Sequence, residues 1–142
     1  MGYGSIGKRH VNNLLKIPNI EIIICTDRSD MDKEIKNKCI IFKSLNDCIR
    51  EKPVASIISN VTSLHIETAL KLASAGLHLF IEKPLSNNLE NIEKLSNIVH
   101  DKKLITFMGY NLRFHNCIKK IKKLLENNEI GKIISVNAES GS

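Results

Sequence analysis

The sequence is poor in residues on which several common protein classes depend. It has no tryptophan, only 4% aromatic residues and four cysteines, none in a Cys-x-x-Cys pair. The cysteine spacings match no zinc module or disulfide scaffold, so we expect reduced thiols and no structural metal. No apolar run approaches the ~18 residues that a membrane helix needs. The first residues also lack the pattern of a secretory signal. These absences favour a cytoplasmic protein.

The net charge is +6, with lysines concentrated at 102–103 and 119–123. Two interpretations stay open: solvated helix faces, or attraction to polyanions that include a phosphate-bearing cofactor. Aromatic and glycine-rich nucleic-acid motifs are absent, so we expect no nucleic-acid partner. A basic polyanion-binding protein remains a minor hypothesis, and its binding should weaken steeply with salt.

Short β-branched runs alternate with longer helical patterns along the chain. Apolar periodicity and turn signals predict strands at 20–26, 39–43, 54–61, 78–82, 104–109 and 132–140. They predict helices at 5–17, 44–51, 63–76, 88–102 and 115–127, with Asn87 as N-cap of the fourth because Glu90 follows three residues later. This alternation predicts an α/β fold with a parallel sheet covered by helices on both faces.

The opening residues carry a G-x-G-x-x-G pattern at Gly2, Gly4 and Gly7. In a dinucleotide site the first glycine permits a tight turn, the second lets the backbone approach a pyrophosphate, and the third lets the helix pack on the sheet. The following helix N-terminus offers unpaired N–H groups to phosphates. Glycines also make ordinary turns, but the amphipathic helix that follows favours the dinucleotide interpretation.

An acidic residue, Asp27, ends the next predicted strand twenty residues beyond Gly7. There a carboxylate can accept hydrogen bonds from a ribose 2′-hydroxyl. Asp27 favours NAD, because it would repel a 2′-phosphate. Arg28 keeps NADP open, since it can pair with such a phosphate, stack on adenine or face water.

The glycine turn normally follows a strand, yet only Met1 precedes it here. In the strand order 3-2-1-4-5-6 that strand is central, and its absence would leave ladder groups of 20–26 and 54–61 unpaired. Each buried unmet group costs ~1–3 kcal/mol. We therefore expect a Rossmann-like, doubly wound sheet that lacks most of its first strand, in a chain that either begins upstream or folds poorly.

Residues 2–10, 60–86 and 108–133 together carry a family resemblance. They read GYGSIGKRH, NVTSLHIETALKLASAGLHLFIEKPLS and MGYNLRFHNCIKKIKKLLENNEIGKI, and they resemble the N-terminal half of the glucose–fructose oxidoreductase, inositol dehydrogenase and MocA-like (Gfo/Idh/MocA) family. The most specific element is Glu82-Lys83-Pro84, placed after a strand and before a helix. For Lys83–Pro84 a cis bond is one option.

The resemblance implies an NAD(P)-binding Rossmann domain at 1–113. Residues 114–142 would form a linking helix and the first strand of a truncated C-terminal α/β substrate domain. The implied activity is hydride transfer between nicotinamide and a hydroxyl or carbonyl carbon of a sugar, cyclitol or related compound. The family's C-terminal aspartate and histidine, and its usual oligomer contacts, lie in the absent half. The fragment alone would therefore turn over little, and a non-catalytic NAD(P)-binding module is the alternative.

The resemblance also implies residue roles. Lys83 would bind substrate and assist proton transfer, its proton loosened by desolvation in a partly closed pocket. The remaining cofactor contacts would come from the glycine turn, the acid after the second strand, the segment after 54–61, the tripeptide and the segment after 104–109: Gly2, Tyr3, Gly4, Ser5, Ile6, Gly7, Asp27, Arg28, Asn60, Thr62, His65, Glu82, Asn111 and Arg113. His65 has the alternatives of capping a helix or facing solvent, and we expect His10 to be structural.

Overall fold

The computed structural model describes residues 1–139, which belong to two compact units. The first unit is Met1–Gly109 and the second is Tyr110–Ser142. No helix in the described part of the chain is long and apolar enough to cross a membrane.

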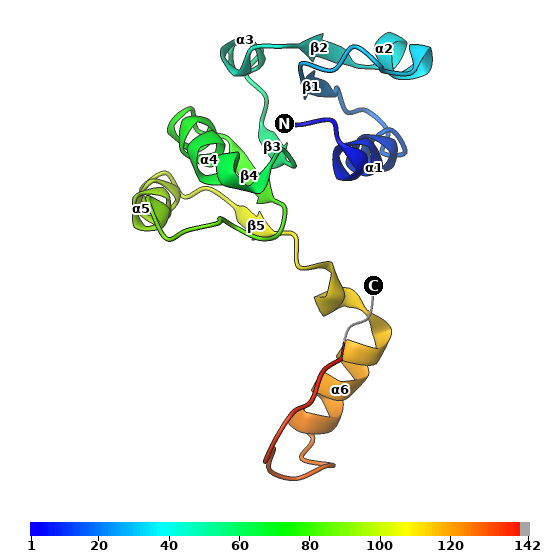
Figure 1. Cartoon of the computed structure of the whole chain (residues 1–142), viewed down its shortest axis with the longest axis vertical. Helices are drawn as coiled ribbons and strands as arrows, with labels where there is room; N and C mark the ends of the chain where they lie inside the picture. The colour runs from blue at the N-terminus through cyan, green and yellow to red at the C-terminus, as the bar shows by residue number, and fades with distance from the viewer. Residues whose placement is uncertain (140–142) are drawn as a thin grey trace. The chain divides into compact units, whose positions relative to one another are not determined.

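The first unit alternates helices and parallel strands (Figure 1). The strands are β1 (Ile23–Cys25), β2 (Ile40–Phe42), β3 (Ala55–Ile58), β4 (His78–Ile81) and β5 (Thr106–Met108). The helices are α1 (Ser5–Leu14), α2 (Lys33–Lys38), α3 (Leu45–Arg50), η1 (Thr62–Leu64), α4 (His65–Ser74) and α5 (Ile92–Asp101). Parallel pairing joins β1 to β2 and, separately, β3 to β4 to β5. The predicted α/β class with a parallel, Rossmann-like sheet is confirmed.

The backbone of Met1 and Gly2 lies between the two sheets. Gly2 N donates to Cys25 O at 3.0 Å, and Ser59 N donates to Met1 O at 2.8 Å. The Met1 amino group donates to Ile57 O at 2.7 Å, and burial lowers its pKa. Beyond these bonds, a cavity of about 750 Å³ separates β1 from β3. In residues 1–139 no strand pairs with both, so the sheet lacks most of its first strand, as expected.

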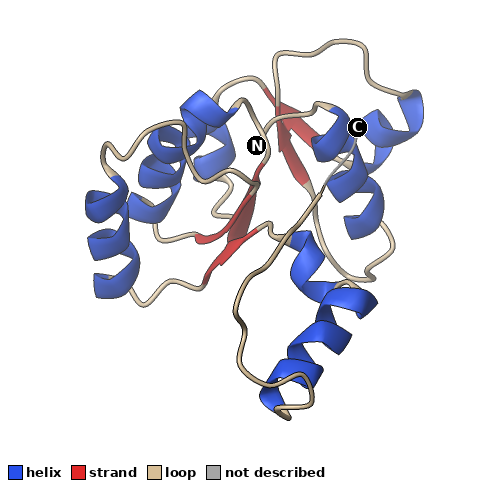
Figure 2. Ribbon diagram, turned by 60° about the horizontal axis from the view of Figure 1, so that its bottom comes forward, coloured by secondary structure: helices blue, strands red, loops and turns tan. Residues whose placement is uncertain are grey.

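Helix α4 packs on one face of the β3–β4–β5 sheet, with α5 beside it, and the helices and strands of the chain are distinguished by colour in Figure 2. The predicted cover of helices on the opposite face is limited to the contact of α1 described below. Side chains alternate along β4: Leu79 and Ile81 pack into a core with α4, whereas Phe80 meets His10 of α1 on the opposite face. On the first face the helix residues Ala69 and Ala73 are fully buried, which lets α4 approach closely. A second core, under α1 and β1, consists of Tyr3, Val11, Ile22, Ile24, Met31 and Ile35.

Two local features differ from the predictions. The helix α2 was not predicted, because Ile35 is its sole buried residue and six residues show no helical period. Asn87 does not cap α5: the helix begins at Ile92 after Asn91, which is left-handed with φ 61°. Instead Asn88 accepts a bond from Glu90 N at 2.9 Å, and such side-chain turns compete with helix formation.

The second unit contains η2 (Asn111–Phe114) and α6 (Asn116–Glu126), whose N-terminus is capped by His115 accepting from Cys117 N. The strand predicted at 132–140 is wrong over 132–139, where no residue forms a strand, and Ser140 lies outside the described residues. Ile134 is 97% exposed and Val136 79% exposed. A β-branched run becomes a strand only where an edge offers it hydrogen bonds and a surface to pack on.

Candidate cofactor site

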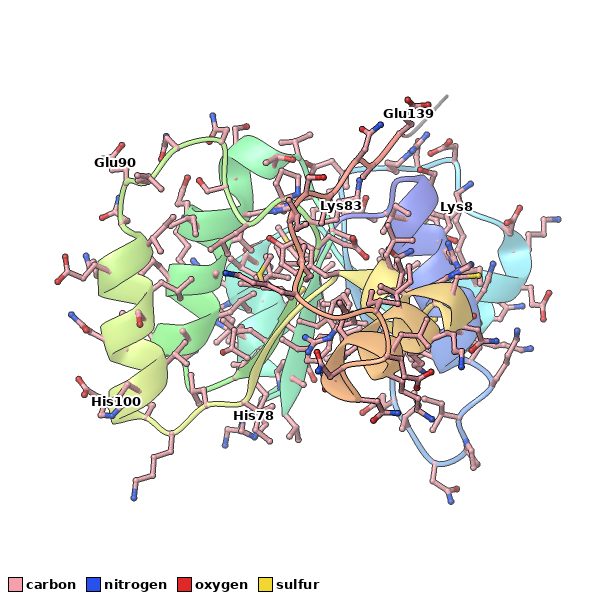
Figure 3. The ribbon with its side chains drawn as sticks, turned by 90° about the horizontal axis from the view of Figure 1, so that it is seen from below. Lys8, His78, Lys83, Glu90, His100 and Glu139 are labelled. Carbon is pink, nitrogen blue, oxygen red and sulfur yellow. The ribbon has the colours of Figure 1, made fainter. Side chains whose placement is uncertain are left out.

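The sequence-predicted residues of the first unit gather at one edge of its sheets. Segments that follow parallel strands emerge at the carboxyl edge, where ligands of open α/β sheets bind. In Figure 3 Lys83, which follows β4, lies toward the edge opposite His78, which begins β4. Four other residues lie at the same edge: Gly2 in the opening turn, Asp27 after β1, Asn60 after β3 and Gly109 after β5.

The opening turn requires glycine at two of its three positions. Gly2 has φ +88°, and a Cβ there would lie 2.7 Å from Asn60 N and 2.8 Å from Ser59 O. A Cβ on Gly7 would overlap the carbonyl oxygen of Gly2. In contrast, a Cβ on Gly4 would have no atom of the described chain within 4 Å. The turn therefore packs tightly on β3 and leaves open space at Gly4.

That open space lies at the N-terminus of α1, a helix of ten residues. Gly4 is the N-cap, and no side chain of the described residues caps the helix. The first N–H groups of a helix have no intrahelical acceptor and carry the positive end of its dipole, which favours an anion. Tyr3 as a whole is 3% exposed, and its side chain belongs to the second core. Ser5 and Ile6 are exposed.

The exposed Asp27 follows β1, and its neighbour Arg28 already has protein partners. Arg28 forms a two-pronged pair with Asp30, with Nε–Oδ1 2.9 Å and Nη2–Oδ2 3.0 Å, and its Nη1 lies 3.5 Å from Tyr3 O. The guanidinium hydrogen bond holds the pKa of Asp30 below its ordinary value. Arg28 is thus held beside the glycine turn by a carboxylate.

Asn60 offers an unpaired acceptor at this edge. Its Nδ2 donates to Thr68 Oγ1 at 3.0 Å, whereas its buried Oδ1 has no hydrogen-bond partner among the described residues. A buried acceptor without a donor costs ~1–3 kcal/mol. The main chain of Asn60 lies against the glycine turn, because a Cβ on Gly2 would meet Asn60 N at 2.7 Å.

His65 is 2% exposed, so the alternative that it faces solvent is wrong. Its Nδ1 lies 2.9 Å from Pro84 O, and its Nε2 lies 3.1 Å from Asn60 O. The ring therefore links the segment after β3 to the segment after β4. This placement favours support of the two loops over direct contact with a ligand. Thr62, the other residue expected in this segment, begins η1 and is half-buried.

Glu82 and Lys83 lie directly after β4, and the Lys83–Pro84 bond is cis. Glu82 N donates to Ile58 O at 2.9 Å, which fixes the start of this segment on β3. The Lys83 side chain is exposed, so residues of this unit do not supply the desolvation expected around its ammonium. His10, expected to be only structural, lies with Nε2 2.8 Å from Glu82 Oε1. The sequence gives no local signal of this contact, because 72 residues separate the pair.

Asn111 and Arg113 belong to the second unit, where both are exposed in η2. Their assignment to the nicotinamide end of a cofactor stays a prediction. Across residues 1–139, no three His, Cys, Asp or Glu side chains are grouped to hold a metal ion.

Comparison with known proteins agrees with this geometry. Residues 1–110 match the oxidoreductase family with an NAD-binding Rossmann fold, Gfo/Idh/MocA. Over 137 residues the chain is 34% identical to myo-inositol 2-dehydrogenase of Thermotoga maritima, covering 93% of this chain and 41% of that protein. It is 29% identical over 140 residues to the NAD⁺-dependent scyllo-inositol 2-dehydrogenase of Bacillus subtilis, covering 94% and 41%.

Solved structures show the same partial overlap. A probable dehydrogenase from Thermotoga maritima superposes with TM-score 0.80 at 34% identity, covering 92% of this chain and 41% of that one. Myo-inositol 2-dehydrogenase from Lactobacillus plantarum superposes with TM-score 0.83 at 26% identity, covering 94% and 41%. The chain therefore spans about two fifths of its relatives' length. It belongs to the Gfo/Idh/MocA oxidoreductase family, of which it contains the NAD-binding Rossmann domain.

Proposed function

We propose that this chain binds NAD as the cofactor part of an oxidoreductase that transfers hydride between nicotinamide and a hydroxyl or carbonyl carbon of a sugar or cyclitol. One observation carries the proposal: the glycine turn is closely packed at Gly2 and Gly7 and open at Gly4, at an uncapped helix N-terminus. Relatives named as inositol and glucose-6-phosphate dehydrogenases support the substrate class.

The order of the strands suggests how the dinucleotide lies. The turn contacts β1 through Gly2 and β3 through Met1 and Gly2, so a diphosphate at α1 would lie above the gap between the sheets. The adenosine half would extend toward Asp27, after β1. The nicotinamide half would extend over β3 and β4, toward Asn60 and Glu82. In this pose the reacting carbon would lie near Lys83.

Each residue then has a chemical task. Asp27 accepts hydrogen bonds from the adenosine ribose, and Asn60 Oδ1 accepts one from the cofactor, since none of residues 1–139 donates to it. Lys83 Nζ carries three N–H donors, with which it can bind the substrate oxygen and pass a proton to or from it. The bound nicotinamide supplies or accepts the hydride. Asn111, Arg113 and Thr62 remain proposed cofactor contacts.

We also propose NAD rather than NADP as the preferred cofactor. The carboxylate of Asp27 would repel a 2′-phosphate, and Arg28 is not a spare cation because Asp30 already pairs with it. The Arg28–Asp30 ion pair is exposed, so it stabilises the fold only slightly. Its two charges nevertheless cancel, so Arg28 adds no net positive charge beside Asp27.

The binding half of the proposal is tested by calorimetric titration of this chain with NADH, NAD⁺ and ADP-ribose. We expect saturable 1:1 binding of all three, and absence of any binding would overturn the proposal. The catalytic half is tested in a chimera in which this chain replaces the equivalent 137 residues of the Thermotoga maritima myo-inositol 2-dehydrogenase. Turnover of NAD⁺ with myo-inositol supports an enzyme, whereas binding without turnover in a folded chimera favours a non-catalytic module.

A further inference from the structure

The contact between His10 and Glu82 joins the opening helix to the Glu82-Lys83-Pro84 segment. His10 Nε2 lies 2.8 Å from Glu82 Oε1, and the two side chains are only 22% and 16% exposed. A hydrogen bond to a carboxylate in such a partly buried place is stronger than one in open water. Because Glu82 can only accept, the Nε2–H of His10 donates.

Aromatic packing fixes the ring of His10. It meets the Phe80 ring edge-on, with centroids 5.3 Å apart and an interplanar angle of 67°, and Phe80 stacks in turn on Phe107 at 5.8 Å. The imidazole therefore packs on the sheet through Phe80 while its Nε2 meets the Glu82 carboxylate.

The Glu82 carboxylate is also held on its other sides. Its Oε2 accepts a bond from Lys83 N at 3.2 Å, so the carboxylate position and the lysine main chain are coupled. Gly109 closes the remaining side, because a Cβ there would lie 3.0 Å from Oε2 and 3.1 Å from the carboxyl carbon. A side chain at residue 109 would therefore require the Glu82 carboxylate to shift by a few tenths of an ångström.

We propose that His10 is a positioning residue for the nicotinamide half of the cofactor site. The helix whose first N–H groups face the diphosphate also carries, within its ten residues, the imidazole that holds Glu82 and through it the main chain of Lys83. One rigid element thereby sets the spacing between the diphosphate and the segment that meets nicotinamide. This inference deepens the proposed function and rests on it.

The test compares NADH with ADP-ribose, which shares the diphosphate and both riboses but lacks nicotinamide. His10→Phe keeps the ring packing and removes the donor, so we expect NADH affinity to fall about tenfold and ADP-ribose affinity to change less than about twofold. His10→Gln, which restores an N–H donor, should recover most of the loss. His100→Gln, at an 89% exposed site on α5, is the matched control and should change neither affinity.

A second perturbation reaches the carboxylate without altering His10. Gly109→Ala would push Glu82 Oε2 away from its place and should lower NADH affinity with the same selectivity. Circular dichroism and thermal melting identify any variant that fails to fold. If either His10→Phe or Gly109→Ala fails to fold, the binding data of the remaining variant test the proposal. Equal loss of both ligands, or no loss of NADH, in the folded variants overturns the positioning role. Failure of wild-type chain to bind ADP-ribose would overturn the proposed function, and the positioning role with it.

Discussion

Three glycines of one motif should respond to alanine in two different ways. Gly2→Ala and Gly7→Ala place a methyl group against backbone atoms, whereas Gly4→Ala places it in open space at the helix N-terminus. We therefore expect the first two variants to lose stability and the third to lose cofactor affinity while its stability stays near that of the wild type.

The magnitudes follow from the geometry. At Gly2 an alanine would adopt φ +88°, which costs ~1–2 kcal/mol for an L residue. Its Cβ would also meet Asn60 N at 2.7 Å, and overpacking adds ~1–3 kcal/mol because the opposing atoms are backbone. At Gly7 the alanine would overlap the Gly2 carbonyl oxygen but would not have a positive φ. The higher helix propensity of alanine would offset ~1 kcal/mol of that destabilisation. Both Gly2→Ala and Gly7→Ala should therefore be less stable than Gly4→Ala.

Urea unfolding gives the free energies, and calorimetric titration with NADH gives the affinities. For Gly4→Ala we expect a change in unfolding free energy within ~0.5 kcal/mol and an affinity at least ~10-fold weaker, since the methyl group would occupy the space proposed for the diphosphate. The reasoning is refuted if Gly4→Ala destabilises the chain as much as Gly2→Ala does. Wild-type NADH affinity in Gly4→Ala would refute the placement of the diphosphate.

Further predictions concern chemistry, specificity and the thiols. In the Thermotoga maritima chimera, Lys83→Ala should lower kcat ~10²–10⁴-fold with little change in NADH affinity, and equal losses would contradict its role. Asp27→Ala should lower the NAD-to-NADP affinity ratio by about tenfold, and an unchanged ratio would remove Asp27 from the site. Burial raises the pKa of Cys48 to about 12 from its ordinary 9.0. The unfolded chain therefore loses this proton first, and the contribution of Cys48 to the unfolding free energy should fall above pH 9 by up to ~1.4 kcal/mol per pH unit. Cys48→Ala should reduce the slope without abolishing it, because burial also raises the pKa of Tyr3 and of Cys39, and an unchanged slope would contradict the assignment. Iodoacetamide should modify exposed Cys117 before buried Cys48 in the native chain, and the reverse order would contradict the burial.

The sequence was most informative where a signal is repeated along a segment. Residues 65–74 have buried side chains at the helical period, so α4 was placed within two residues of each end of the predicted 63–76, with η1 forming its first turn. The strands were placed in the right order, although β1 covers only Ile23–Cys25 of the predicted 20–26. Apolar runs mark what is buried, whereas strand ends depend on which backbone groups find a partner.

The predictions failed where a neighbour outside the segment decides the structure. The run at 132–140 has strand-forming residues, yet 132–139 has no strand because no edge in the described chain pairs with it. Asn87 and Glu90 have the spacing of a capping box, but Ser86 and Asn88 hydrogen-bond locally and delay the helix to Ile92. Helix α2 buries a single side chain, Ile35, so its sequence shows no repeat of apolar residues at the helical spacing.

For the candidate site, the sequence identified positions but not interactions. The motif named the glycines, and the structure shows the positive φ at Gly2 and the close contact at Gly7 that their expected roles require. No spacing rule shows that Arg28 is paired with Asp30, because several acids lie within reach of it in the sequence. The choice of partner depends on how the segment after β1 turns beside the glycine loop, where Arg28 Nη1 lies 3.5 Å from Tyr3 O.

The pair of His10 and Glu82 illustrates this limit in its strongest form. His10 faces an apolar ring on the sheet, and a histidine on the inner face of an amphipathic helix is most simply interpreted as packing. Its function as a donor emerges only when parallel pairing brings the end of β4 beside α1, across 72 residues of chain. The pairing of β4 with β5 brings Gly109 against the Glu82 carboxylate, where a Cβ would lie 3.0 Å from Oε2. His10, Glu82 and Gly109 lie far apart in the sequence but meet at the Glu82 carboxylate. Substitution of His10 or of Gly109 should therefore displace that carboxylate.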